Sequence, residues 1–555
     1  MEYWPLFALI ALAFVIYSIY EFVSKNKKLE NRLKNKFGKA PSNKYKCASP
    51  SLLWEELRAS GSIGSYVDDT TWRDLDLEDV YERIDNCDTT IGQEYLYANL
   101  HALQEDDKFL LQRERLINVF KQEDIRLATQ KILAKLGKRT GQSLAALLFE
   151  PDLFALVNPK QYIFFAVLPL IMACVLPFSL KAGFMLIMAA FIINMCIFNK
   201  AKKELESNLE TISYLMCAVK TGEKLCEQLK NTCPQYCQKL DAALSICKKF
   251  RFGAAVLSVS PQTDADVIVY FFGMLTLQPI IQYNKSINIV KEHQAQISDI
   301  YTLLGEIDIS ICLLSYRASL EQYTIPKATD AVKLKFTDIT HPLLNGAVPN
   351  SATIESNWLL TGSNASGKST FIKAVALNII MAQTIFTCTA AEAALKFCKV
   401  VTSMAVADNV TSGESYFVAE IKSMLRIVQS AQTNKPCYCF IDEILKGTNT
   451  VERIAASQAV LQFITGQDNC LCIAATHDIE LTQMLAQFYT NMHFSEKITQ
   501  NGVSFDYLLK CGASDTRNAI RLLEYYKFPA EIINKANEIA DNNGETNIGS
   551  GIALN

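Results

Sequence analysis

Three long apolar stretches interrupt an otherwise mixed pattern of hydrophobic and polar residues. The first, Trp4–Tyr20, carries no charge, and residues 25–39 after it hold seven basic residues and a single acidic one. The other two, Tyr162–Leu180 and Ala182–Asn199, are separated only by Lys181. Uncharged runs of this length are typical of helices that cross a bilayer. The pattern therefore predicts about three transmembrane helices, the last two forming a hairpin.

The lysines that flank these runs predict their orientation. Cytoplasmic ends of membrane helices are enriched in Lys and Arg, so we expect a multi-pass protein of the cell membrane with residues 24–160 and 200–555 in the cytoplasm. A signal peptide is disfavoured, because the chain starts Met-Glu-Tyr-Trp and no small-residue cleavage site precedes the basic run. For the hairpin, the alternative is a pair of buried core helices. The shorter run Val267–Ile281 predicts a buried helix or one that touches the membrane.

The rest of the chain changes from a helical to an alternating pattern. Residues 51–150 and 200–323 show helical spacing of apolar positions, and short apolar strands alternate with helices after Tyr323. We expect an all-α domain followed by an α/β domain. The predicted order is a transmembrane anchor (1–24), a basic juxtamembrane linker (25–46), a helical region (47–160), a transmembrane hairpin (161–199), a helical region (200–322), the α/β domain (323–541) and a disordered tail (542–555).

The charge and the cysteine content of the chain exclude few classes of function. The net charge of −3 gives no global sign of a nucleic-acid partner, and the basic stretch 25–46 is most simply a membrane flank, although it can also contact lipid or DNA. Seventeen cysteines lack zinc-ligand spacing and indicate a reducing compartment. The pairs Cys437/Cys439 and Cys470/Cys472 each lie on one face of a strand, where we expect small buried hydrophobes rather than ligands.

The most specific chemical motif is a glycine-rich loop between a predicted strand, Asn357–Thr361, and a predicted helix, Phe371–Gln383. Its sequence Gly362-Ser363-Asn364-Ala365-Ser366-Gly367-Lys368-Ser369 matches G-x-x-x-x-G-K-[ST], a phosphate-binding pattern in this context. The glycines let backbone amides surround a phosphate, and the helix presents unpaired N–H groups to the anion. Lys368 supplies a charge to the phosphates, and the Ser369 hydroxyl is suited to Mg²⁺. We expect ATP and Mg²⁺ to bind here, with Thr370 at the end of the site.

Two further strands end in residues that suit phosphoryl transfer. An apolar run ends in Asp442-Glu443, and we expect Asp442 to hold Mg²⁺ and Glu443 to orient or deprotonate water. A second apolar run ends in Thr476-His477, where His477 can sense the γ-phosphate. An isolated histidine at a strand end is more often structural, so this role depends on the neighbouring motifs.

Together, four ordered motifs resemble the MutS family of mismatch-repair ATPases. They are Thr361–Thr370 (T-G-P-N-M-G-G-K-S-T in the family), Asp408–Phe417 (D-x-x-x-S-G-x-S-T-F), Asp442–Thr448 (D-E-x-G-[RK]-G-T) and Thr476–Thr482 (T-H-x-x-E-L). The resemblance implies a P-loop NTPase domain of the MutS/ABC-like type that hydrolyses ATP, with Glu443 and His477 catalytic. It also implies a homodimer in which Ser415 reaches the partner's nucleotide, and binding of mismatched or branched DNA.

Several positions depart from the family pattern. Leu445 replaces a glycine of the D-E box, and Ser363, Ala365 and Ser366 replace loop residues without removing a phosphate ligand. The chain shows no mismatch-reading domain, and a membrane hairpin stands where the family inserts its DNA clamp. The alternative function is therefore a membrane-bound ATPase that couples nucleotide state to a transmembrane or scaffold rearrangement without DNA.

Overall fold

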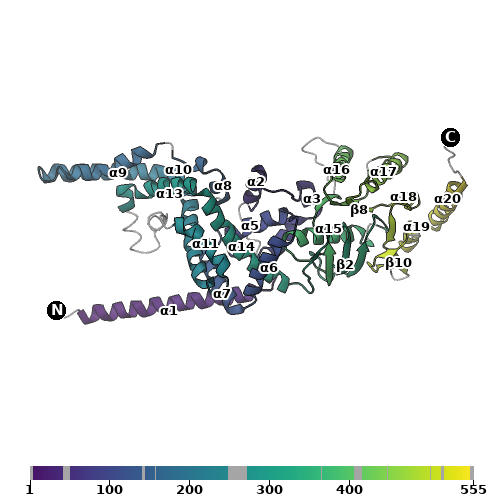
Figure 1. Cartoon of the computed structure of the whole chain (residues 1–555), viewed down its shortest axis with the longest axis horizontal. Coiled ribbons are helices and arrows are strands. Elements are labelled where there is room, and N and C mark those ends of the chain that lie inside the picture. The colour runs from purple at the N-terminus through teal and green to yellow at the C-terminus, as the bar shows by residue number, and fades with distance from the viewer. Residues whose placement is uncertain are drawn as a thin grey trace. The chain divides into compact units, whose positions relative to one another are not determined.

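The computed structural model of the chain describes residues 4–41, 50–139, 144–156, 158–247, 272–363, 366–404, 416–446, 448–499, 502–513 and 518–549. The helices and strands are labelled in Figure 1. They form two compact units. The first comprises residues 1–64, 81–102 and 108–320, and the second comprises residues 65–80, 103–107 and 321–555.

The described residues of the first unit are helical. In chain order the helices are α1 (Trp4–Lys36), α2 (Leu52–Ala59), α5 (Thr90–His101), α6 (Lys108–Phe120), α7 (Glu123–Leu136), α8 (Leu144–Phe149), the 3-10 helix η1 (Pro151–Phe154), α9 (Pro159–Ala173), α10 (Leu180–Leu229), α11 (Pro234–Cys247), α13 (Gln278–Glu292) and α14 (Gln294–Ala318). Helix α4 (Leu77–Ile84) runs from the second unit into the first. The predicted helical character of this region is confirmed.

Helix α14 forms the centre of the first unit. Every residue from Leu304 to Arg317 is buried, and α5, α6 and α11 pack around the helix. Gly305 allows α5 to come close, because a Cβ at this position would lie 2.7 Å from Cγ of Tyr95. Asp308 fixes the start of α5: its carboxylate accepts hydrogen bonds from the backbone N–H and the hydroxyl of Thr89, at 2.8 and 2.6 Å. A buried polar group on α14 thus sets where α5 begins.

A second buried polar contact joins α6 to α14. The guanidinium of Arg113 donates to both carboxylate oxygens of Glu306, at 2.6 and 3.0 Å, and to Oδ1 of Asn99 at 2.7 Å. The side chain of Arg113 is 1% exposed and that of Glu306 is 10% exposed. A charge pair this deeply buried is tolerated because each partner is hydrogen-bonded. Loss of either side chain would leave the other charge buried without its counterion.

Two helices among the described residues are long and apolar enough to cross a membrane, in the spans Pro151–Ala173 and Leu180–Leu229. In their most apolar windows only 12% and 17% of the residues are buried, whereas a core helix of a soluble protein would be mostly buried. The second predicted arm does not end at Asn199, because α10 continues as one helix of 50 residues to Leu229. The predicted first span lies in α1, where the side chains of residues 4–8, 10, 11, 14 and 15 are outside the described set.

The second unit mixes helices and strands, as predicted for the chain beyond Tyr323. Its strands are β1 (Lys327–Ala328), β2 (Leu334–Ile339), β3 (Asn350–Ile354), β4 (Trp358–Thr361), β5 (Glu392–Leu395), β6 (Lys399–Ser403), β7 (Cys437–Asp442), β8 (Cys470–Ala475), β9 (Thr490–His493), β10 (Glu496–Thr499), β11 (Gly502–Phe505) and β12 (Lys510–Cys511). Its helices are α3 (Asp69–Asp74), α15 (Lys368–Thr384), α16 (Tyr416–Ala431), α17 (Thr450–Thr465), α18 (Ile479–Met484), α19 (Asn518–Tyr525) and α20 (Ala530–Gly549).

The larger sheet of this unit has the strand order β12-β9-β4-β8-β7-β6. Strands β9, β4, β8, β7 and β6 are parallel, and only β12 pairs antiparallel with its neighbour β9. Ala475 at the end of β8 lies level with Leu360 of β4 on one side and with Asp442 of β7 on the other. The carboxyl ends of these three strands therefore meet at one edge of the sheet. A smaller sheet has the order β1-β5-β2-β3, and β10 and β11 form a hairpin.

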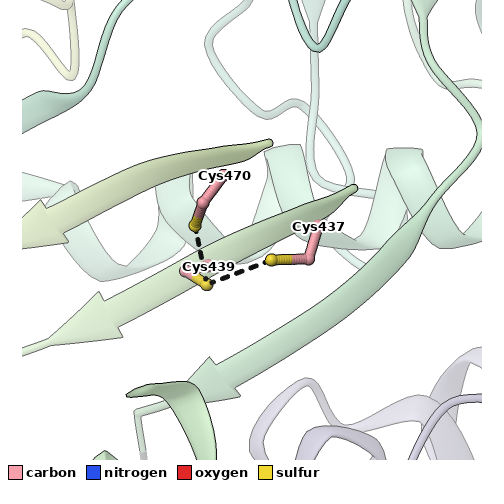
Figure 2. Close-up of side chains that lie close together, drawn as sticks. All are labelled: Cys437, Cys439 and Cys470. Atoms are coloured by element: carbon pink, nitrogen blue, oxygen red, sulfur yellow. Dashed lines mark hydrogen bonds between the residues drawn. The ribbon is translucent and has the colours of Figure 1, made fainter. Parts of the chain in front are cut away.

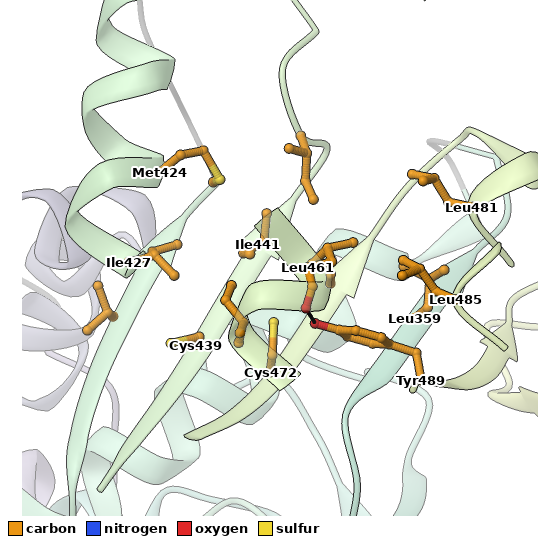
Figure 3. Packing of buried hydrophobic residues seen from close by; sticks show 14 of the residues in the cluster. Leu359, Met424, Ile427, Cys439, Ile441, Leu461, Cys472, Leu481, Leu485 and Tyr489 are labelled. Atoms are coloured by element: carbon orange, nitrogen blue, oxygen red, sulfur yellow. Dashed lines mark hydrogen bonds between the residues drawn. The ribbon is translucent and has the colours of Figure 1, made fainter. Parts of the chain in front are cut away.

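A hydrophobic core covers one face of the larger sheet. Leu359 of β4 and Ile441 of β7 are fully buried there, and Leu461 of α17 and Leu481 of α18 pack on the same cluster. Figure 3 shows these side chains converging between the strands and the helices. Burial of each such side chain contributes about 1.5–3 kcal/mol, so this cluster is what holds the sheet edge in place.

A short segment from the N-terminal part of the chain belongs to the second unit. Asp74 at the end of α3 accepts hydrogen bonds from the hydroxyl of Thr402, at 2.8 Å, and from the backbone N–H of Met404, at 3.0 Å. Both residues lie at the end of β6, the outer strand of the sheet. Asp68 pairs with Arg426 of α16. The sequence pattern gave no sign that residues 65–80 would complete this edge.

The C-terminal end differs from the expected disordered tail. Helix α20 runs from Ala530 to Gly549 and so continues into residues 542–549. The helical backbone passes through Asn542, Asn543 and Gly544, although these residues have low helix propensity.

Removal of Glu306 should destabilise the first unit strongly. In Glu306→Ala the guanidinium of Arg113 stays buried without its carboxylate, which costs about 3–5 kcal/mol, so thermal unfolding of the detergent-solubilised chain should shift to lower temperature. Glu355→Ala is the matched control, because it breaks an exposed ion pair with Lys333 and should change little. The apolar pair Arg113→Met/Glu306→Leu should recover most of the loss. If Glu306→Ala unfolds like the wild type, the pair is not a structural requirement.

Candidate functional site

The glycine loop joins β4 to α15, as predicted, and the helix begins three residues before the predicted start. Gly362 and Gly367 have φ values of 136° and 103°, in the region that residues with a Cβ rarely adopt. A Cβ on Gly362 would also lie 2.5 Å from the carbonyl oxygen of Phe494. Both glycines are therefore required by the backbone. Asn364 and Ala365 lie outside the described residues.

The loop is held by hydrogen bonds of its own side chains. The hydroxyl of Ser366 donates to the carbonyl of Ser363 at 2.6 Å, and the hydroxyl of Ser363 donates to the carboxylate of Glu496. Ser366 is fully buried, Ser369 is half-buried and Thr370 is exposed at the start of α15. The four unpaired N–H groups at this helix start face the end of the loop, which is a favourable place for an anion.

Lys368 is fully buried at the first position of α15. Its ammonium group donates to the carbonyl of Gly362 and lies 3.4 Å from both ring nitrogens of His477. Burial lowers the pKa of Lys368 to about 8, with a smaller contribution in the same direction from the nearby charge of Lys446. A positive charge is thus held inside the protein beside the loop, in an environment that disfavours it.

The strands β7 and β8 bring two more predicted residues to the same place. The ring Nε2 of His477, just after β8, lies 2.7 Å from Oε1 of Glu443, just after β7. Burial, helped by the charge of Lys368, lowers the pKa of His477, so the ring is neutral at neutral pH. A neutral ring protonated on Nε2 donates to Glu443 and can accept from Lys368 at Nδ1. Lysine, histidine and glutamate therefore form one connected chain of hydrogen bonds.

Asp442 at the end of β7 carries a buried carboxylate oxygen. Among the described residues, its buried Oδ1 has no hydrogen-bond partner. A buried acceptor without a partner is unfavourable, and it is where a cation would be stabilised. Mg²⁺ takes oxygen ligands and is often held by one or two carboxylates together with phosphate oxygens. Asp442 and the Ser369 hydroxyl therefore fit the predicted divalent cation.

The turn after β7 departs from ordinary backbone geometry. Glu443 and Leu445 have φ values of 59° and 55°, in the left-handed region. Glu443 also pairs with Lys446, and the backbone N–H of Lys446 donates to Glu420 of α16 at 2.9 Å. Leu445 is the position at which the family pattern has glycine, and the backbone conformation that favours glycine is kept. Burial of the leucine side chain, 4% exposed, offsets the strain.

A pocket of about 530 Å³ opens beside the loop. Gly367, Thr370 and Phe371 line one side, and His341 lines another. Burial lowers the pKa of His341 to about 4, so this ring is neutral as well. The remaining lining residues are mostly apolar or small: Ile339, Thr340, Leu344, Asn345, Gly346, Ala347, Val348, Asn350, Ala374, Phe494 and Tyr507. The volume is that of a small-molecule site.

Several residues to which the sequence assigns no role meet at this site. Glu496 contacts the glycine loop, Lys446 pairs with Glu443, and Tyr507 lies 3.2 Å from the position of a Cβ on Gly367. Glu496 and Tyr507 belong to the region of the β10–β11 hairpin, whose sequence carries no recognisable motif. Ser415 and the rest of residues 405–415, including most of the predicted Asp408–Phe417 motif, lie outside the described residues.

The fold and the site together define a mixed α/β domain whose polar side chains gather at the carboxyl edge of a parallel sheet, where domains of this class bind their ligands. Comparison with known proteins identifies it further. Residues 358–543 match the family model of MutS domain V. The second unit therefore carries a region similar to MutS domain V.

Individual relatives carry the same name. Over 255 residues the chain is 33% identical to the DNA mismatch repair protein MutS of Pseudothermotoga lettingae, over 44% of this chain and 31% of that protein. It is 30% identical to MutS of Rickettsia bellii over 42% of this chain and 28% of that protein, and 28% identical to MutS of Fusobacterium nucleatum over 47% and 30%. The matched regions thus span less than a third of these relatives.

The strained turn gives a direct test of the site's backbone. At an ordinary position alanine is more stable than glycine by about 1 kcal/mol, but at a positive φ the Cβ of alanine clashes and the order reverses. We therefore expect Leu445→Gly to be more stable than Leu445→Ala by about 1 kcal/mol in chemical denaturation. Leu425, 53% exposed within α16, is the matched leucine, and there alanine should be the more stable. The same order at both positions would show that Leu445 is not left-handed.

Proposed function

We propose that the chain is a membrane-anchored MutS-type ATPase that binds ATP with Mg²⁺ in the P-loop domain formed by its second unit and hydrolyses it. The observation that carries this proposal is the meeting of Lys368, Glu443 and His477 at the ends of three neighbouring strands. The order of the five parallel strands supports it, because β8 lies between the strand before the glycine loop and the strand that ends in Asp442. The phosphate end of the nucleotide would then lie against the loop and its base in the adjoining pocket.

Each side chain has a role that follows from its position. The buried ammonium of Lys368 binds the β- and γ-phosphate oxygens, and the loop amides surround them. Glu443 orients the attacking water and accepts its proton, while His477 reports the state of the γ-phosphate to Glu443 through their hydrogen bond. Asp442 and Ser369 would hold Mg²⁺, which neutralises negative charge on the phosphates when it is bound. The neutral His341 ring and the aromatic side chains of the pocket suit a nucleobase.

The two apolar helices support the membrane part of the proposal. Their exposed side chains include Phe164 and Phe184, at 60% and 64%, and the turn between the helices exposes Phe178, at 90%. Large apolar side chains are unfavourable in water over such an extent, and a lipid environment removes that cost. The α1 helix would add a third span before its basic end. We propose that the chain lies in the cell membrane with the ATPase domain in the cytoplasm.

The partners are proposed from the resemblance alone. The relatives are named as DNA mismatch repair proteins, so mismatched or branched DNA is the candidate ligand of this chain too. The family's ATPase domains act in pairs, which makes a homodimer the expected state, with Ser415 reaching the nucleotide of the second copy. The competing function, a membrane ATPase that moves its hairpin or a scaffold without DNA, is supported by the membrane helices.

Nucleotide binding and hydrolysis should separate in two variants. Lys368→Ala removes the buried charge and should abolish ATP binding in calorimetry. Glu443→Gln keeps the shape of the side chain but removes its charge, so this variant should bind ATP and hydrolyse it at least about 100-fold more slowly. Lys335→Ala, an exposed lysine of β2, is the control and should retain both. Normal turnover by Glu443→Gln would show that another group activates the water.

DNA dependence decides between the two proposed functions. The ATPase rate of the detergent-solubilised chain should be measured without DNA and with duplex, mismatched and branched DNA. Stimulation by mismatched or branched DNA beyond that by duplex is the result expected for a MutS-type function. An ATPase that responds to none of them would favour the function without DNA, provided that Lys368→Ala is inactive in the same preparation.

A further inference from the structure

Three thiols of the second unit lie together at the edge of the sheet opposite the nucleotide site. Cys437 and Cys439 lie on β7, and Cys470 is the first residue of β8. Their Sγ atoms are 3.9 Å apart between Cys437 and Cys439 and 3.4 Å apart between Cys439 and Cys470, and all three lie within 4.8 Å of one another. Figure 2 shows the three side chains pointing toward one another across the two strands.

The register of the parallel strands explains why they meet. Cys437 pairs with Cys470, and Cys439 pairs with Cys472. Paired residues of neighbouring strands point to the same face, and so do residues i and i+2 of one strand. All four thiols are therefore directed to the face that carries the hydrophobic core. The spacing that suggested two separate pairs in the sequence becomes one cluster in the sheet.

The potential ligand atoms of the cluster are all cysteine sulfurs. Cys437 and Cys439 are 1% and 0% exposed, and Cys470 is half-buried, which leaves one side of the cluster open to solvent. No carboxylate or imidazole joins the three sulfurs in this cluster of the described residues.

The 3.9 Å between the sulfurs of Cys437 and Cys439 is the spacing of sulfur atoms that share a metal ion, and the 3.4 Å between those of Cys439 and Cys470 is shorter. At a metal–sulfur distance of about 2.3 Å, sulfur atoms in trigonal or tetrahedral arrangement lie about 3.8–4.0 Å apart. Sulfur ligands without oxygen exclude Mg²⁺ and Ca²⁺ and select soft ions such as Cu(I) and Zn(II).

We propose that Cys437, Cys439 and Cys470 form a binding site for a soft metal ion, Cu(I) or Zn(II), that ties β7 to β8. Binding converts the thiols to thiolates and releases their protons to solvent. Cu(I) needs only these three ligands. Zn(II) usually takes four; Cys472 lies level with Cys439 but outside the group of close sulfurs, so its side chain would have to turn toward the ion to become the fourth. The same two strands end in Asp442 and Ala475 at the nucleotide site, so the ion stabilises the strands without touching the reaction.

The test uses the full chain, purified under reducing, metal-free conditions. It is incubated with Zn(II), with Cu(I) or with Mg²⁺, desalted, and its metal content is measured. One equivalent of Zn(II) or Cu(I) and none of Mg²⁺ is expected, with a rise in unfolding temperature. Cys439→Ala, which removes the central sulfur, should lower affinity at least tenfold. Cys388→Ala, a buried cysteine elsewhere in the unit, should bind as the wild type does.

Two measurements on the loaded protein keep the proposal falsifiable even if a variant fails to fold. X-ray absorption of the wild type should show a sulfur-only shell, with three neighbours for Cu(I) or four for Zn(II). Cys472→Ala should lose Zn(II) and keep Cu(I). A shell of nitrogen or oxygen, the absence of stoichiometric metal, or a Cys439–Cys470 disulfide without bound ion would each overturn the proposal.

Discussion

The buried ammonium group of Lys368 is the constraint on which the proposed nucleotide site depends. A charge removed from water is costly unless groups of the protein solvate it, and among the described residues no carboxylate lies within ion-pair distance of this one. In the part of the chain that the structure describes, its polar neighbours are the carbonyl of Gly362 and the ring of His477. Asp442 is the negative counterpart: among the described residues its buried Oδ1 has no hydrogen-bond partner. A site with both features is complete only when an anion and a cation bind together, which is what a nucleotide with its metal supplies.

The rest of the second unit serves to hold these groups at fixed positions. Parallel pairing of β4, β8 and β7 sets their ends level, and the core cluster prevents the strands from sliding. The turn after β7 keeps a left-handed residue at Leu445 at the expense of strain, because Glu443 must face His477. The opposite ends of β7 and β8 carry the thiol cluster. The same two strands thus connect the catalytic edge to the proposed metal.

Helix α10 contributes both to the buried core of the first unit and to its apolar hairpin. The first turns of α10 are apolar and exposed, whereas Leu209 to Leu229 provide many of its buried residues. No loop separates the two parts, so a force on the arm would reach the core through an unbroken helix. This continuity gives the apolar hairpin a direct mechanical connection to the helical core, whichever ligand the chain takes.

Much of the fold could be predicted, because apolar periodicity marks helices and strands directly. The glycine loop, the two strand-end motifs and the change of pattern near Tyr323 all depend on local sequence. The contributions of Glu496 and of residues 65–80 could not be predicted, since they depend on contacts between segments far apart in the chain. The thiol cluster could be predicted only in part. Each i, i+2 pair can be read from the sequence, but only the register of β7 against β8 shows that the two pairs lie together.

The central claim is that the glycine loop and the two strand ends form one nucleotide site. The most direct measurement is an experimental structure of the chain with Mg²⁺ and a non-hydrolysable ATP analogue. The account predicts the triphosphate along residues 362–369, the ammonium of Lys368 moved from the Gly362 carbonyl to a phosphate, and Asp442 Oδ1 beside the metal. A nucleotide bound elsewhere, or bound here with Lys368 still on the Gly362 carbonyl, would contradict it.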